Sequence, residues 1–181
     1  MNETNDCSEC GFSDAGVELE DVPAALRRFG KRYRAPLTRF LPGEDGDALL
    51  RARLESGPMT WSALEYAAHV RDVFGWYDEW VRASVEVDGF VVEAPGRDEA
   101  AQLGRYNEAD PVAVADELGA NAERLAVTFE ELPQDAWERV HVRHGHPRTA
   151  AFTARRAVHE GNHHLLDIGR VLRAVREGAA K

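Results

Sequence analysis

Two histidines stand four residues apart in the segment HEGNHH, which covers residues 159–164. The surrounding sequence has a helical pattern, and residues at i and i+4 of a helix share one face. Imidazoles placed in this way can bind one metal ion, since neutral histidine is a common ligand of zinc and also suits nickel and iron. The pair His159 and His163 is therefore the first candidate for a metal site.

The same segment also fits the HExxH pattern of zinc metalloproteases, in which Glu160 would act as the general base between two ligands. That pattern is short and often arises by chance. No third-ligand motif follows it, and no long substrate-binding domain follows either. We therefore disfavour the protease interpretation.

A third ligand is expected from His69, which lies among apolar residues in another helical segment. Helix bundles build metal sites from facing helices. Three protein ligands leave a coordination position for water or substrate, as in catalytic zinc sites. We expect His69, His159 and His163 to form such a site. The alternative for His69 is a structural hydrogen bond inside the core.

Two carboxylates have the spacing to support these ligands. Asp167 follows His163 by four residues, and Glu65 precedes His69 by four. Ligating histidines usually donate their second ring N–H to a carboxylate or a carbonyl, although ordinary i,i+4 surface pairs would have the same spacing. His164 is turned by roughly 100° from its neighbour, so we expect it to miss the metal.

Three further histidines, His141, His144 and His146, lie in a region that contains glycine and proline. Such residues favour turns. We expect these histidines to lie in a solvated turn, away from the metal.

Both cysteines of the chain belong to one Cys7-x-x-Cys10-Gly motif. This motif is typical of half a zinc knuckle or a redox pair, and a complete knuckle would need two more ligands. A mobile tail with two reduced thiols is an equally good interpretation. Because the motif lies in a polar lead-in far before His69, we expect any thiol or metal site there to be separate from the three-histidine site.

The bulk composition limits the function. The chain has 181 residues, enough for one domain, and a formal net charge of −10 with a pI of about 5.2. This acidic balance disfavours nucleic acid as a partner. The apolar runs are too short to span a bilayer, and the N-terminus lacks the basic and apolar regions of a signal peptide. We expect a cytoplasmic protein without a membrane partner.

Apolar residues recur at helical spacing in four long segments, which are approximately residues 21–41, 60–85, 110–132 and 149–176. A shorter helix is expected over residues 45–55. Glycine and proline mark residues 87–110 and 133–148 as irregular connections. The sequence predicts an all-α four-helix bundle at residues 21–181, after an irregular lead-in at residues 1–20 that contains the CxxC motif.

Three motifs carry a resemblance to a known family: WSALEYAAHVRDV at residues 61–73, HEGNHHLLDI at residues 159–168, and CSECGF at residues 7–12. They resemble motifs of DinB-like proteins of the DinB/YfiT superfamily, which includes the metal-binding domain of mycothiol-dependent maleylpyruvate isomerase. The resemblance implies a four-helix bundle that binds a divalent metal through three residues, usually histidines. The matching positions are His69, His159 and His163.

The resemblance also implies a function. Characterised relatives use mycothiol or bacillithiol, so we expect zinc or nickel, a low-molecular-weight thiol such as mycothiol, and transfer or isomerisation of a small electrophile by a metal-bound thiolate. A metal-dependent hydrolase that activates water and a non-catalytic bundle that binds a metal or a small ligand are the alternatives. The expected partners are the small-molecule thiol and electrophile, with a homodimer as the assembly if one forms.

Overall fold

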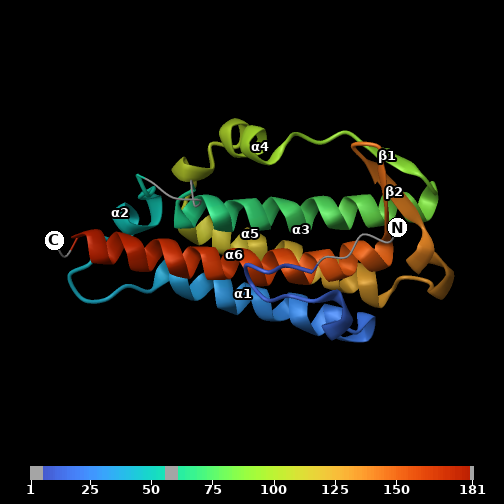
Figure 1. The fold of residues 1–181 in the computed structure, drawn as a ribbon, viewed down its shortest axis with the longest axis horizontal. Coiled ribbons are helices and arrows are strands. Elements are labelled where there is room, and N and C mark those ends of the chain that lie inside the picture. The colour runs from blue at the N-terminus through green and yellow to red at the C-terminus, as the bar shows by residue number, and fades with distance from the viewer. Residues whose placement is uncertain (1–5, 56–60, 180–181) are drawn as a thin grey trace.

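The computed structural model describes residues 6–55 and 61–179 (Figure 1). This part is mostly helical, which confirms the predicted fold class. Four long helices form the bundle: α1 (Val22–Thr38), α3 (Ala63–Glu86), α5 (Pro111–Glu130) and α6 (Ala150–Ala179). Helices α1 and α3 each pack against both α5 and α6, so α6 has α1 on one side and α3 on the other. No helix in the described ranges is long and apolar enough to cross a bilayer.

Side chains at the helix starts explain where α3 and α5 begin. The Ser62 hydroxyl caps α3 by accepting a hydrogen bond from the backbone N–H of Glu65, and the Glu65 carboxylate accepts one from the backbone N–H of Ser62. This capping box satisfies two N–H groups that the helix leaves unpaired. Asp110 caps α5 by accepting from the N–H of Ala113. The predicted start at Thr60 lies outside the described residues.

Helix α6 is fixed against α1 at Gly161. The ring of Phe29 lies so close that a Cβ at position 161 would collide with it. The buried Tyr33 hydroxyl donates a 2.8 Å hydrogen bond to the Gly161 carbonyl oxygen. These contacts set the rotation of α6 in the stretch that carries most of the candidate ligands.

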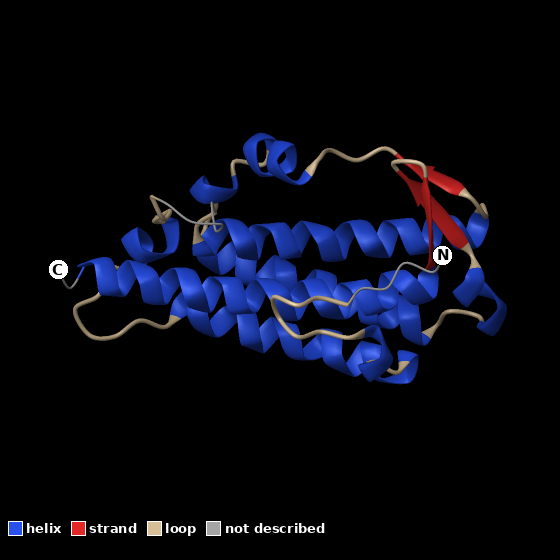
Figure 2. Ribbon diagram, viewed as in Figure 1, coloured by secondary structure: helices blue, strands red, loops and turns tan. Residues whose placement is uncertain are grey.

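Short helix α2 (Gly46–Arg51) lies inside the stretch where a short helix was predicted, residues 45–55. The two predicted irregular connections contain more structure than expected. Short helix α4 (Arg97–Leu103) lies beside the bundle, and a three-stranded sheet covers one end of it (Figure 2). Strand β2 (Val140–Arg143) pairs in parallel with β1 (Phe90–Val92) and antiparallel with β3 (His146–Thr149). The irregular connections predicted from the sequence are wrong in these stretches, since strands of three or four residues are too short to show a clear alternation.

The N-terminal segment, residues 6–21, lies along α6 (Figure 1). It contains a backbone bridge between Cys7 and Phe12 and two 3₁₀ turns, Asp14–Gly16 and Leu19–Asp21. Two arginines of α6 hold it: Arg155 donates to the carbonyl oxygen of Val17, and Arg170 donates to that of Glu9. The CxxC motif is thereby placed next to the last helix.

Candidate metal centre

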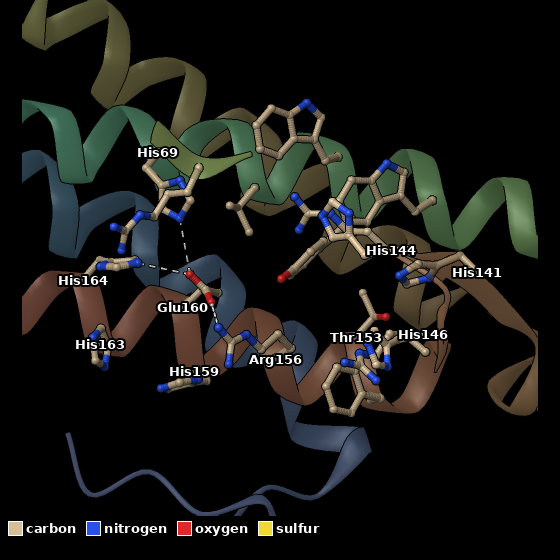
Figure 3. Close-up of a pocket in the computed structure, with 18 residues that line it drawn as sticks. His69, His141, His144, His146, Thr153, Arg156, His159, Glu160, His163 and His164 are labelled. Carbon is tan, nitrogen blue, oxygen red and sulfur yellow. Dashed lines mark ion pairs between the residues drawn. The ribbon is translucent and has the colours of Figure 1, made fainter. Parts of the chain in front are cut away.

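Helix α6 presents two different pairs of metal-ligating side chains. Glu160 and His164 point toward α3 and His69, whereas His159 and His163 lie on the side of the N-terminal segment (Figure 3). Successive residues of a helix differ by roughly 100° in direction. A shift of one residue along the chain therefore moves an i,i+4 pair from one neighbour of α6 to another.

The first set, called here the His–Glu–His group, consists of His69 from α3 and of Glu160 and His164 from α6. Their ligand atoms lie within 4.8 Å of one another, and all three side chains are buried. Oε2 of Glu160 is 3.2 Å from Nε2 of His164 and 3.5 Å from Nε2 of His69. Two imidazoles and one carboxylate are a donor set that zinc, iron and similar divalent ions use in open sites.

Two further charged residues hold this group in place. Oδ2 of Asp167 lies 3.0 Å from Nδ1 of His164, on the side of the ring away from Glu160. Arg156 forms an ion pair with the other oxygen of Glu160. A carboxylate behind a ligating imidazole fixes its orientation and its tautomer, so the arrangement suits a metal at Nε2.

The protonation states also suit a cation. Burial by itself would raise the pKa of Glu160, but hydrogen bonds from His164 and His69 and the charge of Arg156 hold that pKa well below its usual range. Burial opposes protonation of His164, yet Asp167 and Glu160 outweigh it and raise its pKa to about 9. Burial also lowers the pKa of His69. Protonated His164 thus places a positive charge beside the carboxylate of Glu160, at the position where a bound divalent ion would place one.

The second set consists of Cys7, Cys10, His159 and His163, whose ligand atoms also lie within 4.8 Å of one another. The expected trio is therefore not brought together: His159 and His163 face the cysteines, and His69 faces the other pair of α6. His164, expected to miss the metal, occupies the position predicted for His163. The rotation of α6, which the sequence does not reveal, decides between the two pairs.

The two predicted supporting carboxylates differ in their contacts. Asp167 contacts His164, and its Oδ2 also lies 3.4 Å from Nε2 of His163. Glu65 instead pairs with Arg53 and caps α3. Side chains of a helix lean toward its N-terminus, so Glu65 points back to the start of α3 and away from His69.

A cavity of about 550 Å³ adjoins the His–Glu–His group. It is lined by α3, α6, the β2–β3 hairpin and the first residue of α4 (Figure 3). All seven histidines of the chain line it, as do four arginines: Arg97, Arg143, Arg148 and Arg156. Among the described residues that line the cavity, Glu160 is the only carboxylate. The cavity is thus rich in cations although the whole chain carries a net charge of −10.

The prediction of a solvated turn is wrong for His141, whereas His144 and His146 are exposed at or beside the hairpin turn. His141 on β2 is 3 % exposed, and burial, reinforced by the charges of Arg148 and Arg143, lowers its pKa to about 4. His144 and His146 lie at the turn and the start of β3. The pairing of β2 with a strand some fifty residues earlier brings this hairpin over the end of the bundle.

Comparison with known proteins places this geometry in a family. YfiT from Bacillus subtilis, described as a probable metal-dependent hydrolase with an unusual four-helix bundle topology, has 13% sequence identity and a TM-score of 0.76, over 97% of this chain and 93% of that chain. The mycothiol-dependent maleylpyruvate isomerase has 18% identity and a TM-score of 0.60, over 87% of this chain and 63% of that chain. No curated protein sequence matches. The profile of the DinB superfamily matches residues 25–168, so the chain belongs to the DinB superfamily.

Proposed function

We propose that this chain is a metal-dependent enzyme that joins a low-molecular-weight thiol, such as mycothiol, to a small anionic electrophile. The observation that carries the proposal is the position of the His–Glu–His group in the lining of the cavity. A volume of about 550 Å³ is typical of sites for small molecules. Three protein ligands leave coordination positions for an added ligand.

His69, Glu160 and His164 would hold the metal, with zinc or nickel as the expected ions. When bound, such an ion lowers the pKa of a coordinating thiol or water and keeps the resulting nucleophile in place. Asp167 orients the ring of His164 by accepting a hydrogen bond from its Nδ1–H group. Arg156 keeps the carboxylate of Glu160 in position through their ion pair.

The arginines support an anionic substrate. Arg143 packs over the ring of Trp80 at 5.1 Å, and its Nε is buried without a hydrogen-bond partner among the described residues. Such a donor is costly to leave unpaired. Guanidinium groups bind carboxylates through paired hydrogen bonds, so a carboxylate on the substrate would satisfy Arg143.

The use of a thiol is supported by family membership and by the fold shared with the mycothiol-dependent isomerase. The chain spans 63% of that isomerase, so the reaction of the longer protein is carried over here only as a proposal. Hydrolysis is the second candidate, because YfiT resembles this chain over nearly the whole length of both. A hydrolase would use the same ligands with water in place of the thiol.

The test is a product assay on the zinc-loaded chain. We would incubate mycothiol with an electrophile that carries a carboxylate and, in parallel, with its methyl ester, and measure thioether by mass spectrometry. The proposal expects product that requires both metal and thiol, with the carboxylate preferred. His164→Ala should abolish it together with the metal, whereas His144→Ala, a change at the hairpin turn, should retain the metal.

Two outcomes would overturn the proposal. Cleavage of esters or amides that needs the metal but gains nothing from thiol would establish the hydrolase. A metal-loaded chain that neither transfers thiol nor cleaves these substrates would leave only a binding role for the bundle.

A further inference from the structure

We propose that Cys7, Cys10, His159 and His163 form a second metal site, in which a structural zinc ion clamps the N-terminal segment to α6. The spacing is Cys-x2-Cys in the segment and His-x3-His on the helix, within the range used by zinc sites. This zinc clamp shares no ligand with the His–Glu–His group. It is therefore independent of the reaction proposed above.

A tight turn brings the two sulfurs together. The backbone N–H of Cys7 donates to the Phe12 carbonyl at 2.9 Å, and that of Gly11 donates to the Cys7 carbonyl at 2.9 Å. Gly11 has a φ of +72°, which favours glycine over residues with a side chain. Across from this turn, His159 and His163 share one face of α6, and Sγ of Cys7 lies 3.6 Å from Nδ1 of His163.

The strongest sign of a missing ligand is His159. His159 is only 6 % exposed, and both of its ring nitrogens are buried without a hydrogen-bond partner among the described residues. Phe12 stacks on this ring with centroids 5.0 Å apart and covers it. Buried polar groups in native proteins are nearly always satisfied. A metal held with the two cysteines would satisfy His159.

His163 has the contacts of a metal ligand with outer support. Its Nδ1 faces Cys7, whereas its Nε2 lies 3.4 Å from Oδ2 of Asp167 and 3.6 Å from Oε2 of Glu9. A ligating histidine usually donates its second N–H to a carboxylate in this way. We therefore assign Nδ1 as the ligand atom and Nε2 as the donor.

The donor set indicates what the site does. Two thiolates and two imidazoles are a tetrahedral set for structural zinc, and four protein ligands leave no position for substrate. Zinc binding deprotonates coordinating thiols, so loading would release protons from Cys7 and Cys10. The clamp would hold the segment that covers this side of α6.

The experiment uses cobalt as the probe, because cobalt that replaces zinc shows near-ultraviolet charge-transfer absorption when thiolates bind it. The chain has only two cysteines, so in thiol-free buffer any such absorption must come from Cys7 and Cys10. The proposal expects two metal equivalents per chain and this absorption in the wild type. The double variant Cys7→Ser, Cys10→Ser should lose one equivalent and the absorption.

Two matched variants separate the two sites. His164→Ala should lose the other equivalent and keep the charge-transfer absorption. Glu20→Gln, which changes an exposed carboxylate of the same N-terminal segment, should keep both. A wild type without thiolate absorption would overturn the clamp even if the serine variant failed to fold. Retention of two equivalents by a folded double variant would overturn it as well. Failure of the thiol-transfer assay would not affect these results.

Discussion

His159 and Glu160 are adjacent on α6, yet their side chains join different groups. His159 packs under Phe12 beside the cysteines, and Glu160 faces His69. Because consecutive helical residues point roughly 100° apart, one helix supplies two interleaved i,i+4 pairs. A substitution at position 160 or 164 should therefore affect one site, and a substitution at 159 or 163 the other.

Asp167→Asn should weaken metal binding at the His–Glu–His group. The carboxylate of Asp167 is an anion that accepts a hydrogen bond from the Nδ1–H of His164 and so fixes the tautomer of that ring. A neutral amide in its place would hold the ring less firmly. Loss of such support typically costs about 10–100-fold in metal affinity. Because Oδ2 of Asp167 also lies 3.4 Å from Nε2 of His163, competition with a chromogenic chelator should be measured in the Cys7→Ser, Cys10→Ser background, where the His–Glu–His group is the site left to bind metal.

The matched control is Glu65→Gln, which alters a carboxylate four residues before His69. Because Glu65 is engaged by Arg53 and Ser62, this variant should lose stability but keep the metal affinity. Equal losses of affinity in the two variants would contradict the contacts described here.

Gly161→Ala should destabilise the bundle. The added methyl group would collide with the ring of Phe29 and push α6 away from α1. Overpacking of this kind costs about 1–3 kcal/mol. Gly169→Ala on the same helix meets no atom within 4 Å, and its higher helix propensity should stabilise by roughly 0.5–1 kcal/mol. Urea unfolding of both variants would show opposite shifts of the midpoint.

Arg143→Gln should impair binding of a carboxylated substrate. A charge-assisted hydrogen bond contributes about 1.5–3 kcal/mol, so we expect KM to rise roughly 10–100-fold, with little change for the methyl ester. Arg34→Gln, which breaks a surface ion pair with Asp116, should change neither value. Equal effects of Arg143→Gln on the acid and its ester would remove Arg143 from substrate recognition.

Stability should fall in acid partly because of His141. Its folded-state pKa is about 4, while that of an unfolded histidine is about 6.5. As the pH falls from 6.5 to 4, the unfolded chain takes up a proton that the folded chain excludes, so the free energy of unfolding falls. The shift corresponds to roughly 2–3 kcal/mol across this window. His141→Gln should show a shallower decline in urea titrations between pH 7 and 4, and an identical slope would refute the assignment.

The positions of the four long helices could be predicted from the sequence, but the set of side chains that meet at the candidate metal centre could not. Long segments with apolar residues at helical spacing predicted the four long helices of the bundle. The pairs His159/His163 and Glu160/His164 have the same spacing, so only the rotation of α6, set by the Gly161 contact with α1, distinguishes them. The cavity could not be predicted either, because the β2 strand that lines it pairs with β1 across some fifty residues.

Most of the residues that line the cavity come from two parts of the chain, the long helices and the hairpin of β2 and β3. His69, Glu160 and His164 stand on long helices fixed by the bundle core, whereas Arg143, His144 and Arg148 belong to the hairpin. Loops tolerate insertion and exchange far better than packed helices. Under the proposed function, a change of a few hairpin residues would therefore alter which substrate is bound, while the metal ligands on the helices stay the same.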